Sequence, residues 1–190
     1  MSVQKRYAGR SDVPLTQSGL QQAAAAAKRL ASAGLDVIVA SPLQRTVATA
    51  SEVAAVTGVQ VVTDEGFRET DFGVWDGLTF AEVRQRWPAE LATWLADPAV
   101  PPPGGESLAD VSIRVTEALR RVLAGHPRQR VLIVSHVTPI KTLIAAALLA
   151  PPAALYRMHL DVAALCEIDW YADGPAVLRS FNDTGHLDPA

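Results

Sequence analysis

The stretch RVLIVSHVTPI, residues 130–140, decides the class of fold. Its four aliphatic residues at 131–134 form a short run typical of a buried β-strand. Ser135 and His136 follow this run, and Thr138 with Pro139 then opens an apolar helical pattern. A strand that leads directly into a helix is the repeating unit of α/β proteins, and His136 stands at the junction. From this stretch alone, His136 is explained equally well as a buried core residue or as a catalytic one.

The same strand-then-helix unit occurs earlier in the chain. LDVIVA (35–40) predicts a buried strand, and SPLQRTVATASEVAAVTG (41–58) predicts the helix that follows it. Ser41 is the expected N-cap of that helix, with Pro42 at its first position and Gln44 two residues further on. Two such units indicate parallel strands whose carboxyl ends lie at one edge of a sheet.

The remaining segments continue the alternation of helices and strands. Helices are predicted at about 20–30, 79–87, 108–125 and 138–149, and strands at 59–63, near 163–171 and near 175–181. Thr79 and Glu82 have the spacing of a capping box at the start of the second of these helices. The last two strands are joined by Asp-Gly-Pro and are expected to form an antiparallel hairpin at one edge. We therefore predict a single domain over residues 1–190, a three-layer α/β/α sandwich with a mostly parallel sheet and an antiparallel edge.

Composition narrows the classes of function. The net charge is −3, which gives no electrostatic reason to expect binding to nucleic acid. Apolar runs such as 143–152 are too short for a membrane-spanning helix, which needs about 20 residues. No apolar leader follows Met1, and the single cysteine, Cys166, excludes an internal disulfide. We expect a cytoplasmic protein that binds neither membranes nor nucleic acid.

The start of the helix at 41–58 is a candidate anion site. Ligands of open α/β sheets bind beyond the carboxyl ends of the strands. A helix N-terminus attracts anions, and the guanidinium of Arg45 is suited to phosphate. The alternative is that Ser41 only caps the helix and that Arg45 is solvated. His136 follows a second strand of the same sheet, which favours one crevice shared by the two strand ends.

The segment FRETDFGVWDG (67–77) offers carboxyl groups. If it is extended, Glu69 and Asp71 share one face, and either could act as a general acid if burial raised its pKa. The alternative is an ordinary acidic loop with a turn at Asp76-Gly77. Since no pair of histidines or carboxylates has the spacing of metal ligands, we expect no metal and no other cofactor.

Taken in order, these segments resemble the histidine phosphatase superfamily, which has the phosphoglycerate-mutase-like fold. The resemblance rests on RYAGRSDVPLTQSGLQQA (6–23), SPLQRTVATA (41–50), FRETDFGVWDGLT (67–79), PPGGES (102–107) and VLIVSHVTP (131–139). The sequence is most similar to small phosphatases of the alpha-ribazole phosphatase or broad acid phosphatase kind, some of which are fused behind an RNase H domain. Mutases of the family usually carry longer insertions after the acidic loop, so the compact chain favours a phosphatase.

The resemblance implies a phosphohistidine mechanism on a small phosphorylated metabolite. Arg45 matches the arginine that clamps the phosphate, Glu69 the proton donor, and His136 the second histidine, which steadies the transferring phosphoryl group. Ala8 and Gly9 match the loop whose backbone approaches the substrate. The remaining expected contacts with substrate come from Ser2, Ser41 and the backbone N–H of Val137.

Two departures from the family pattern stand out. The family opens with an apolar strand, central in its sheet, that ends in Arg-His-Gly and supplies the nucleophile, yet no Arg-His dipeptide occurs in these 190 residues. We therefore expect a domain that lacks its first strand and has very low or no activity by itself. Val137 stands where many members have glycine, and its side chain leaves a substrate less room to approach the backbone there. A non-catalytic phosphate-binding or interaction domain and a phosphoglycerate mutase remain alternatives, and a homodimer or an RNase H fusion is possible.

Overall fold

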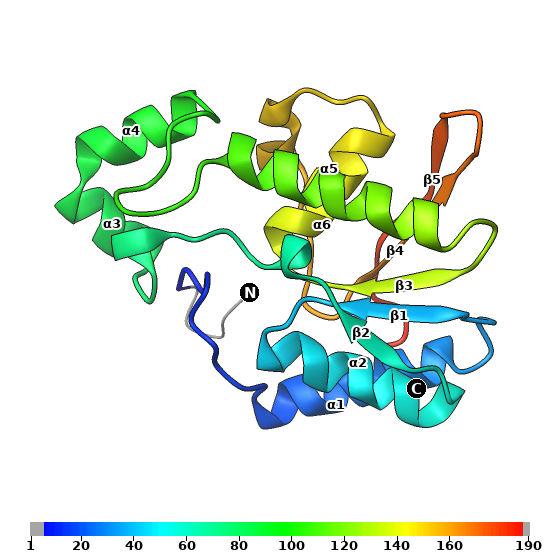
Figure 1. Cartoon of the computed structure of the whole chain (residues 1–190). Helices are drawn as coiled ribbons and strands as arrows, with labels where there is room; N and C mark the ends of the chain where they lie inside the picture. The colour runs from blue at the N-terminus through cyan, green and yellow to red at the C-terminus, as the bar shows by residue number, and fades with distance from the viewer. Residues whose placement is uncertain (1–5, 188–190) are drawn as a thin grey trace.

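The computed structural model describes residues 6–187, and the predicted contact at Ser2 lies outside them. Within this range a three-stranded parallel sheet has the order β2–β1–β3 (Figure 1). These strands are Val61–Thr63, Val37–Ala40 and Val131–Val134 respectively. Ala40 pairs with Val134 at the carboxyl ends of β1 and β3, so the residues after both strands are neighbours.

Helices cover both faces of this sheet, as predicted. Ile38 and Ala40 of β1 pack on α1 (Gln17–Leu30) and α2 (Gln44–Thr57), whereas Val39 packs on α5 (Leu108–Gly125) and α6 (Val137–Ala147). This division follows from the alternation of side chains along a strand. Figure 1 shows α1 and α2 below the strands and α5 and α6 above them. The α/β class with a parallel sheet and an antiparallel strand pair is confirmed.

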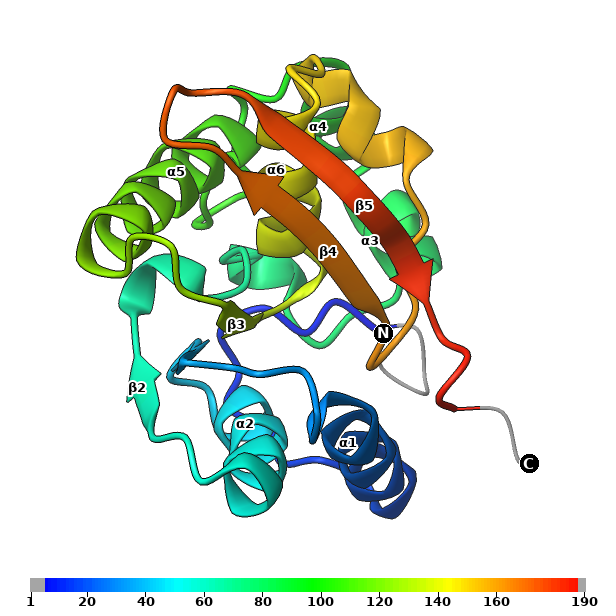
Figure 2. The ribbon, with the colours of Figure 1, turned by 90° about the vertical axis from the view of Figure 1, so that its right-hand side faces the viewer.

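The last two strands form a separate antiparallel sheet. β4 (Leu165–Trp170) pairs only with β5 (Ala176–Asp183) among the described residues. In both views β4 lies between β3 and β5, so unpaired edges of β3 and β4 face one another (Figures 1 and 2). Side chains from both strands, including Ile133 and Ile168, pack against the same core cluster. The sheet is therefore interrupted between β3 and β4, within the described part of the chain.

The burial of β3 reflects this interruption. β1, with neighbours on both sides, buries three of its four residues, whereas β3 consists wholly of aliphatic residues and buries none of them fully. Aliphatic residues on every position of a strand are typical of strands covered on both faces and flanked on both edges. The sequence of β3 is thus that of an interior strand, while its position is that of an edge.

A smaller lobe follows the acidic segment. α3 (Phe80–Arg86) begins at Thr79, whose side chain and that of Glu82 form the predicted capping box. α4 (Pro88–Ala96) was not predicted, although its proline at the first helical position is a known start signal. Three short 3₁₀ helices complete the described part of the chain, η1 (Glu65–Phe67), η2 (Gly73–Trp75) and η3 (Pro152–Arg157). The lobe has its own aromatic core, built by Phe72, Trp75, Val83, Leu91 and Trp94.

Candidate functional site

The carboxyl ends of β1 and β3 bring Ser41 and His136 into contact. The Nε2 atom of His136 lies 2.7 Å from the Oγ atom of Ser41. Both side chains are buried. This contact follows from the register of the two strands, because Ser41 and His136 leave neighbouring strands at the same edge.

His136 is held neutral by its surroundings. Burial lowers its pKa from the ordinary value of 6.5 to about 3, and the positive charges of Arg45 and Arg114 add to that effect. A neutral imidazole can donate a hydrogen bond from one nitrogen and accept at the other. His136 is also the N-cap residue of α6, so the free N–H groups of that helix begin beside it.

The predicted cap at Ser41 is wrong, because α2 begins at Gln44 with Leu43 as its N-cap residue. The side chain of Asp12, 32 residues earlier, takes the place of a local cap. Its Oδ1 atom accepts a hydrogen bond of 2.7 Å from the N–H of Gln44. The Oγ atom of Ser41 accepts only a long hydrogen bond of 3.5 Å from the N–H of Leu43, and its shorter contact is with His136.

Arg45 binds the loop at residues 8–11. Its guanidinium donates to the carbonyl oxygens of Ser11 and Gly9 at 2.9 Å and to that of Ala8 at 3.3 Å. Burial lowers the pKa of Arg45, while the nearby Glu69 opposes this shift. The structure thus brings Ala8, Gly9 and Arg45 together.

Asp76 fixes the same loop from its other side. Its carboxylate accepts from the N–H of Gly9 at 2.9 Å and from the N–H of Ser11 at 3.1 Å. Sequence reasoning treated Asp76 as part of an ordinary turn and missed this role. Gly9 is required sterically, since a Cβ atom there would lie 2.5 Å from the carbonyl oxygen of Thr70.

Glu69 is the buried carboxyl group of the site. Its Oε1 accepts from the N–H of Thr70 at 2.8 Å, and its Oε2 from the N–H of Thr138 at 3.4 Å. Burial raises the pKa of Glu69 above its usual range, against the opposing effects of these hydrogen bonds and of Arg45. A raised pKa is the property that a carboxyl group needs to act as a general acid near neutral pH.

Asp71 has a different environment from Glu69. It is partly exposed, accepts from the N–H of Gly73 at 2.9 Å and lies 3.5 Å from the guanidinium of Arg10. Asp71 therefore organises a turn and an ion pair, whereas Glu69 faces the strand ends and contacts the first turn of α6.

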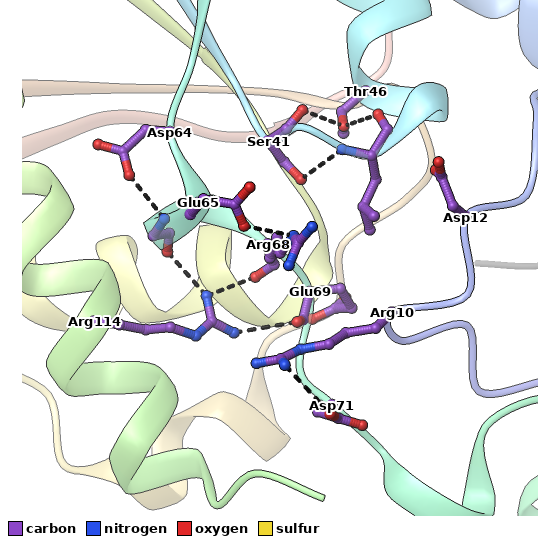
Figure 3. Close-up of polar contacts among 12 residues, drawn as sticks. Arg10, Asp12, Ser41, Thr46, Asp64, Glu65, Arg68, Glu69, Asp71 and Arg114 are labelled. Carbon is purple, nitrogen blue, oxygen red and sulfur yellow. Dashed lines mark hydrogen bonds and ion pairs between the residues drawn. The ribbon is translucent and has the colours of Figure 1, made fainter.

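Arg114 and Glu106 hold the acidic segment against α5, and sequence reasoning missed both. Figure 3 shows Arg114 reaching from α5 to the acidic segment. The guanidinium of Arg114 pairs with the carboxylate of Glu106 through Nε at 2.7 Å and Nη2 at 2.8 Å. It also donates to the carbonyl oxygens of Gly66, Arg68 and Glu69. The available signal was a single arginine beside the apolar face of a strongly amphipathic helix.

The other predicted positions lie near the site or away from it. Val137 is the first residue of α6, directly after His136. His126 contacts Gln129 and His159 contacts Asp161, both at exposed positions. Among residues 6–187, no three His, Cys, Asp or Glu side chains are placed to share a metal ion. Over the same range no helix combines the length and the apolar character that crossing a membrane requires.

Comparison with known proteins gives the family. Residues 1–184 match the model of the histidine phosphatase superfamily, branch 1. The chain is 46% identical over 188 residues to "Bifunctional protein Rv2228c" of Mycobacterium tuberculosis, covering 98% of this chain and 52% of that protein. It thus spans about half the length of this relative. It is also 34% identical to "Phosphoserine phosphatase 1" of Hydrogenobacter thermophilus, covering 96% of this chain and 86% of that one.

Solved structures agree with this placement. "Bacillus stearothermophilus YhfR" superposes with a TM-score of 0.90 at 31% identity, covering 98% of this chain and 93% of that chain. The alpha-ribazole phosphatase from Shigella flexneri superposes with a TM-score of 0.86 at 27% identity, covering 95% and 90%. From its sequence match and from its fold, the chain belongs to the histidine phosphatase superfamily, branch 1.

Proposed function

We propose that this site is the phosphate site of a phosphomonoester hydrolase that acts through a phosphohistidine intermediate on a small phosphorylated metabolite. One observation carries the proposal: Arg45, Glu69 and a neutral His136 converge where β1 and β3 end. A positive group, a carboxyl group with a raised pKa and a buried hydrogen-bonding imidazole are together what this kind of phosphoryl transfer requires.

Each residue has a distinct part in the proposed reaction. The nucleophilic histidine forms a nitrogen–phosphorus bond as the phosphorus–oxygen bond to the leaving group breaks, and Glu69 gives its proton to that oxygen. Arg45 and His136 stabilise the charge on the equatorial oxygens. Water then attacks phosphorus, Glu69 accepts a proton from it, and the nitrogen–phosphorus bond breaks to release phosphate and free histidine.

The nucleophile itself is proposed to come on a further strand between β3 and β4. No Arg-His dipeptide occurs in the sequence. The unpaired edges of β3 and β4 support this position, since one extended segment would join the two sheets into one. A histidine at the carboxyl end of such a strand, if parallel to β3, would emerge beside His136.

The proposal is tested by comparing two proteins. The chain alone is expected to bind inorganic phosphate without releasing phosphate from p-nitrophenyl phosphate. A version with an apolar strand ending in Arg-His-Gly fused ahead of Met1 is expected to release it and to form a phosphohistidine visible by phosphorus NMR. The matched control replaces the added histidine by alanine. Absence of turnover in a folded fusion would overturn the proposal.

A non-catalytic phosphate-binding domain is the second candidate. The observation that favours it is that Arg45 and His136 lie near one another where β1 and β3 end, which is sufficient for binding phosphate. It predicts phosphate binding without turnover in both proteins. A phosphoglycerate mutase is the third, and bisphosphoglycerate-dependent mutase activity in the fusion would reveal it. Cytoplasmic location, RNase H fusion and dimer formation stay predictions.

A further inference from the structure

A cleft of about 310 Å³ lies beside the proposed phosphate site, between the acidic segment and α5. Its lining is dominated by four arginines, Arg10, Arg68, Arg114 and Arg121, with Glu65 and Glu117 as the carboxylates among its residues. Four guanidinium groups around one cleft repel one another unless anions compensate them. The pairing of each arginine therefore decides what the cleft can bind.

Three of these arginines keep donors available. Among the described residues, the guanidinium of Arg10 has one ionic contact, at 3.5 Å to Asp71, and that of Arg68 has one, from Nε to Glu65 at 2.8 Å. Arg121 contacts Asp64 through Nε and Nη2, which leaves its Nη1 unused. A guanidinium offers five N–H donors, so most of the donors of these residues are free.

Arg114 differs from the other three. All three of its nitrogens are engaged by Glu106 and by three carbonyl oxygens, so it positions the wall of the cleft. The carboxylates of Asp64, Asp71 and Glu106, which compensate Arg121, Arg10 and Arg114, do not line the cleft. Four arginines against two carboxylates, Glu65 and Glu117, therefore leave an excess of positive charge in the lining of the cleft.

The cleft and the phosphate site share a wall. Arg10 follows Gly9, whose carbonyl oxygen accepts from Arg45, and Arg68 precedes Glu69. Arg114 donates to the carbonyl oxygen of Glu69. Figure 3 shows Arg10, Arg68 and Arg114 around the segment that carries Glu69. A phosphoester bound at Arg45 would thus have the cleft within reach of its leaving group.

We propose that Arg10, Arg68 and Arg121 form a second anion subsite, which selects phosphomonoesters whose leaving group carries a carboxylate or another anionic group. This inference rests on the proposed function and specifies its substrate class. Guanidinium groups pair well with carboxylates, and hydrogen bonds between charged groups are about twice as strong as neutral ones. The carboxylate of the ligand would pair with the guanidinium groups that line the cleft.

The test compares two ligands on the 190-residue chain by calorimetry. 6-Phosphogluconate and sorbitol 6-phosphate have the same six-carbon chain and phosphate, and differ in a carboxylate or a hydroxymethyl group at the far end. We expect 6-phosphogluconate to bind about tenfold more tightly, the effect of one hydrogen bond between charged groups. The preference should fall at least threefold in Arg121→Gln and in Arg68→Gln, and should weaken as salt is added.

Arg120→Gln is the matched control, because Arg120 is an exposed neighbour on the same helix that does not line the cleft. It should keep the full preference. Equal affinity for the two ligands, with phosphate still bound, would overturn the second subsite alone. If inorganic phosphate does not bind and Arg45→Gln changes nothing, the proposed function fails as well.

Discussion

At the scale of the residue, His136 shows how burial decides chemistry. Its sequence position left a core role and a functional role equally open. The structure places it against Ser41, with the positive charges of Arg45 and Arg114 nearby. An imidazole that stays neutral over the whole physiological range is suited to hydrogen bonding with a phosphoryl group, and it makes folding sensitive to acid.

We predict that His136 lowers stability as the pH falls from about 6.5 towards 3. In that window the unfolded histidine binds a proton and the folded one does not, so the unfolded state is favoured by acid. The free energy of unfolding should lose up to about 1.4 kcal/mol per pH unit from this group. Urea unfolding between about pH 4.5 and 6.5 measures it, with His136→Gln showing a shallower slope. Parallel slopes would show that the folded histidine titrates normally.

Gly9 is a second residue whose role is steric. In Gly9→Ala the new Cβ would meet the carbonyl oxygen of Thr70 at 2.5 Å, so the loop must move away from Arg45 and Asp76. We expect a loss of about 1–3 kcal/mol of stability, as in overpacked cores, together with weaker phosphate binding. Gly125→Ala is the control, because its Cβ meets no atom within 4 Å. Equal stability of the two variants, measured by thermal unfolding, would refute this account.

At the scale of the element, local signals in the sequence predicted what local chemistry decides. The capping box of Thr79 and Glu82 marked the start of α3, and the β-branched runs marked β1 and β3. The start of α2 was misplaced because Asp12, far along the chain, provides its cap. The ion pair of Arg114 and Glu106 was missed for the same reason, because a tertiary contact produces no periodic pattern in the sequence.

Arg114 joins α5 to the acidic segment, and we expect Arg114→Met to separate them. Glu106 would lose its partner at a mostly buried position, and three carbonyl oxygens would lose a donor. Breaking a buried ion pair costs about 3–5 kcal/mol, and partial exposure should place this loss near the lower end. Urea unfolding measures the change, and the double variant with Glu106→Gln should cost less than the sum of the two single changes. Additive losses would show that the pair does not act as a unit.

At the scale of the whole molecule, the main finding is the interrupted sheet. The segments that carry Arg45 and His136 were predicted to share one edge because each follows a strand with a clear pattern, and β1 and β3 do end side by side. Glu69 was assigned to the site only through the resemblance. The gap between β3 and β4 was expected only from the resemblance to a family with one more strand. Periodicity reports whether a strand is buried, but it does not identify the neighbours of that strand.

The edges of β3 and β4 give the last prediction. Backbone N–H groups on an unpaired edge exchange with solvent faster than those within a ladder. In hydrogen exchange, peptides covering Val131–Val134 and Leu165–Trp170 should therefore retain fast-exchanging amides in this chain. In the fusion that adds an apolar strand ending in Arg-His-Gly, both peptides should become protected together, while Val61–Thr63 of β2 serves as an unchanged edge. Protection of one peptide without the other would mean that the added segment pairs with one sheet and does not join the two.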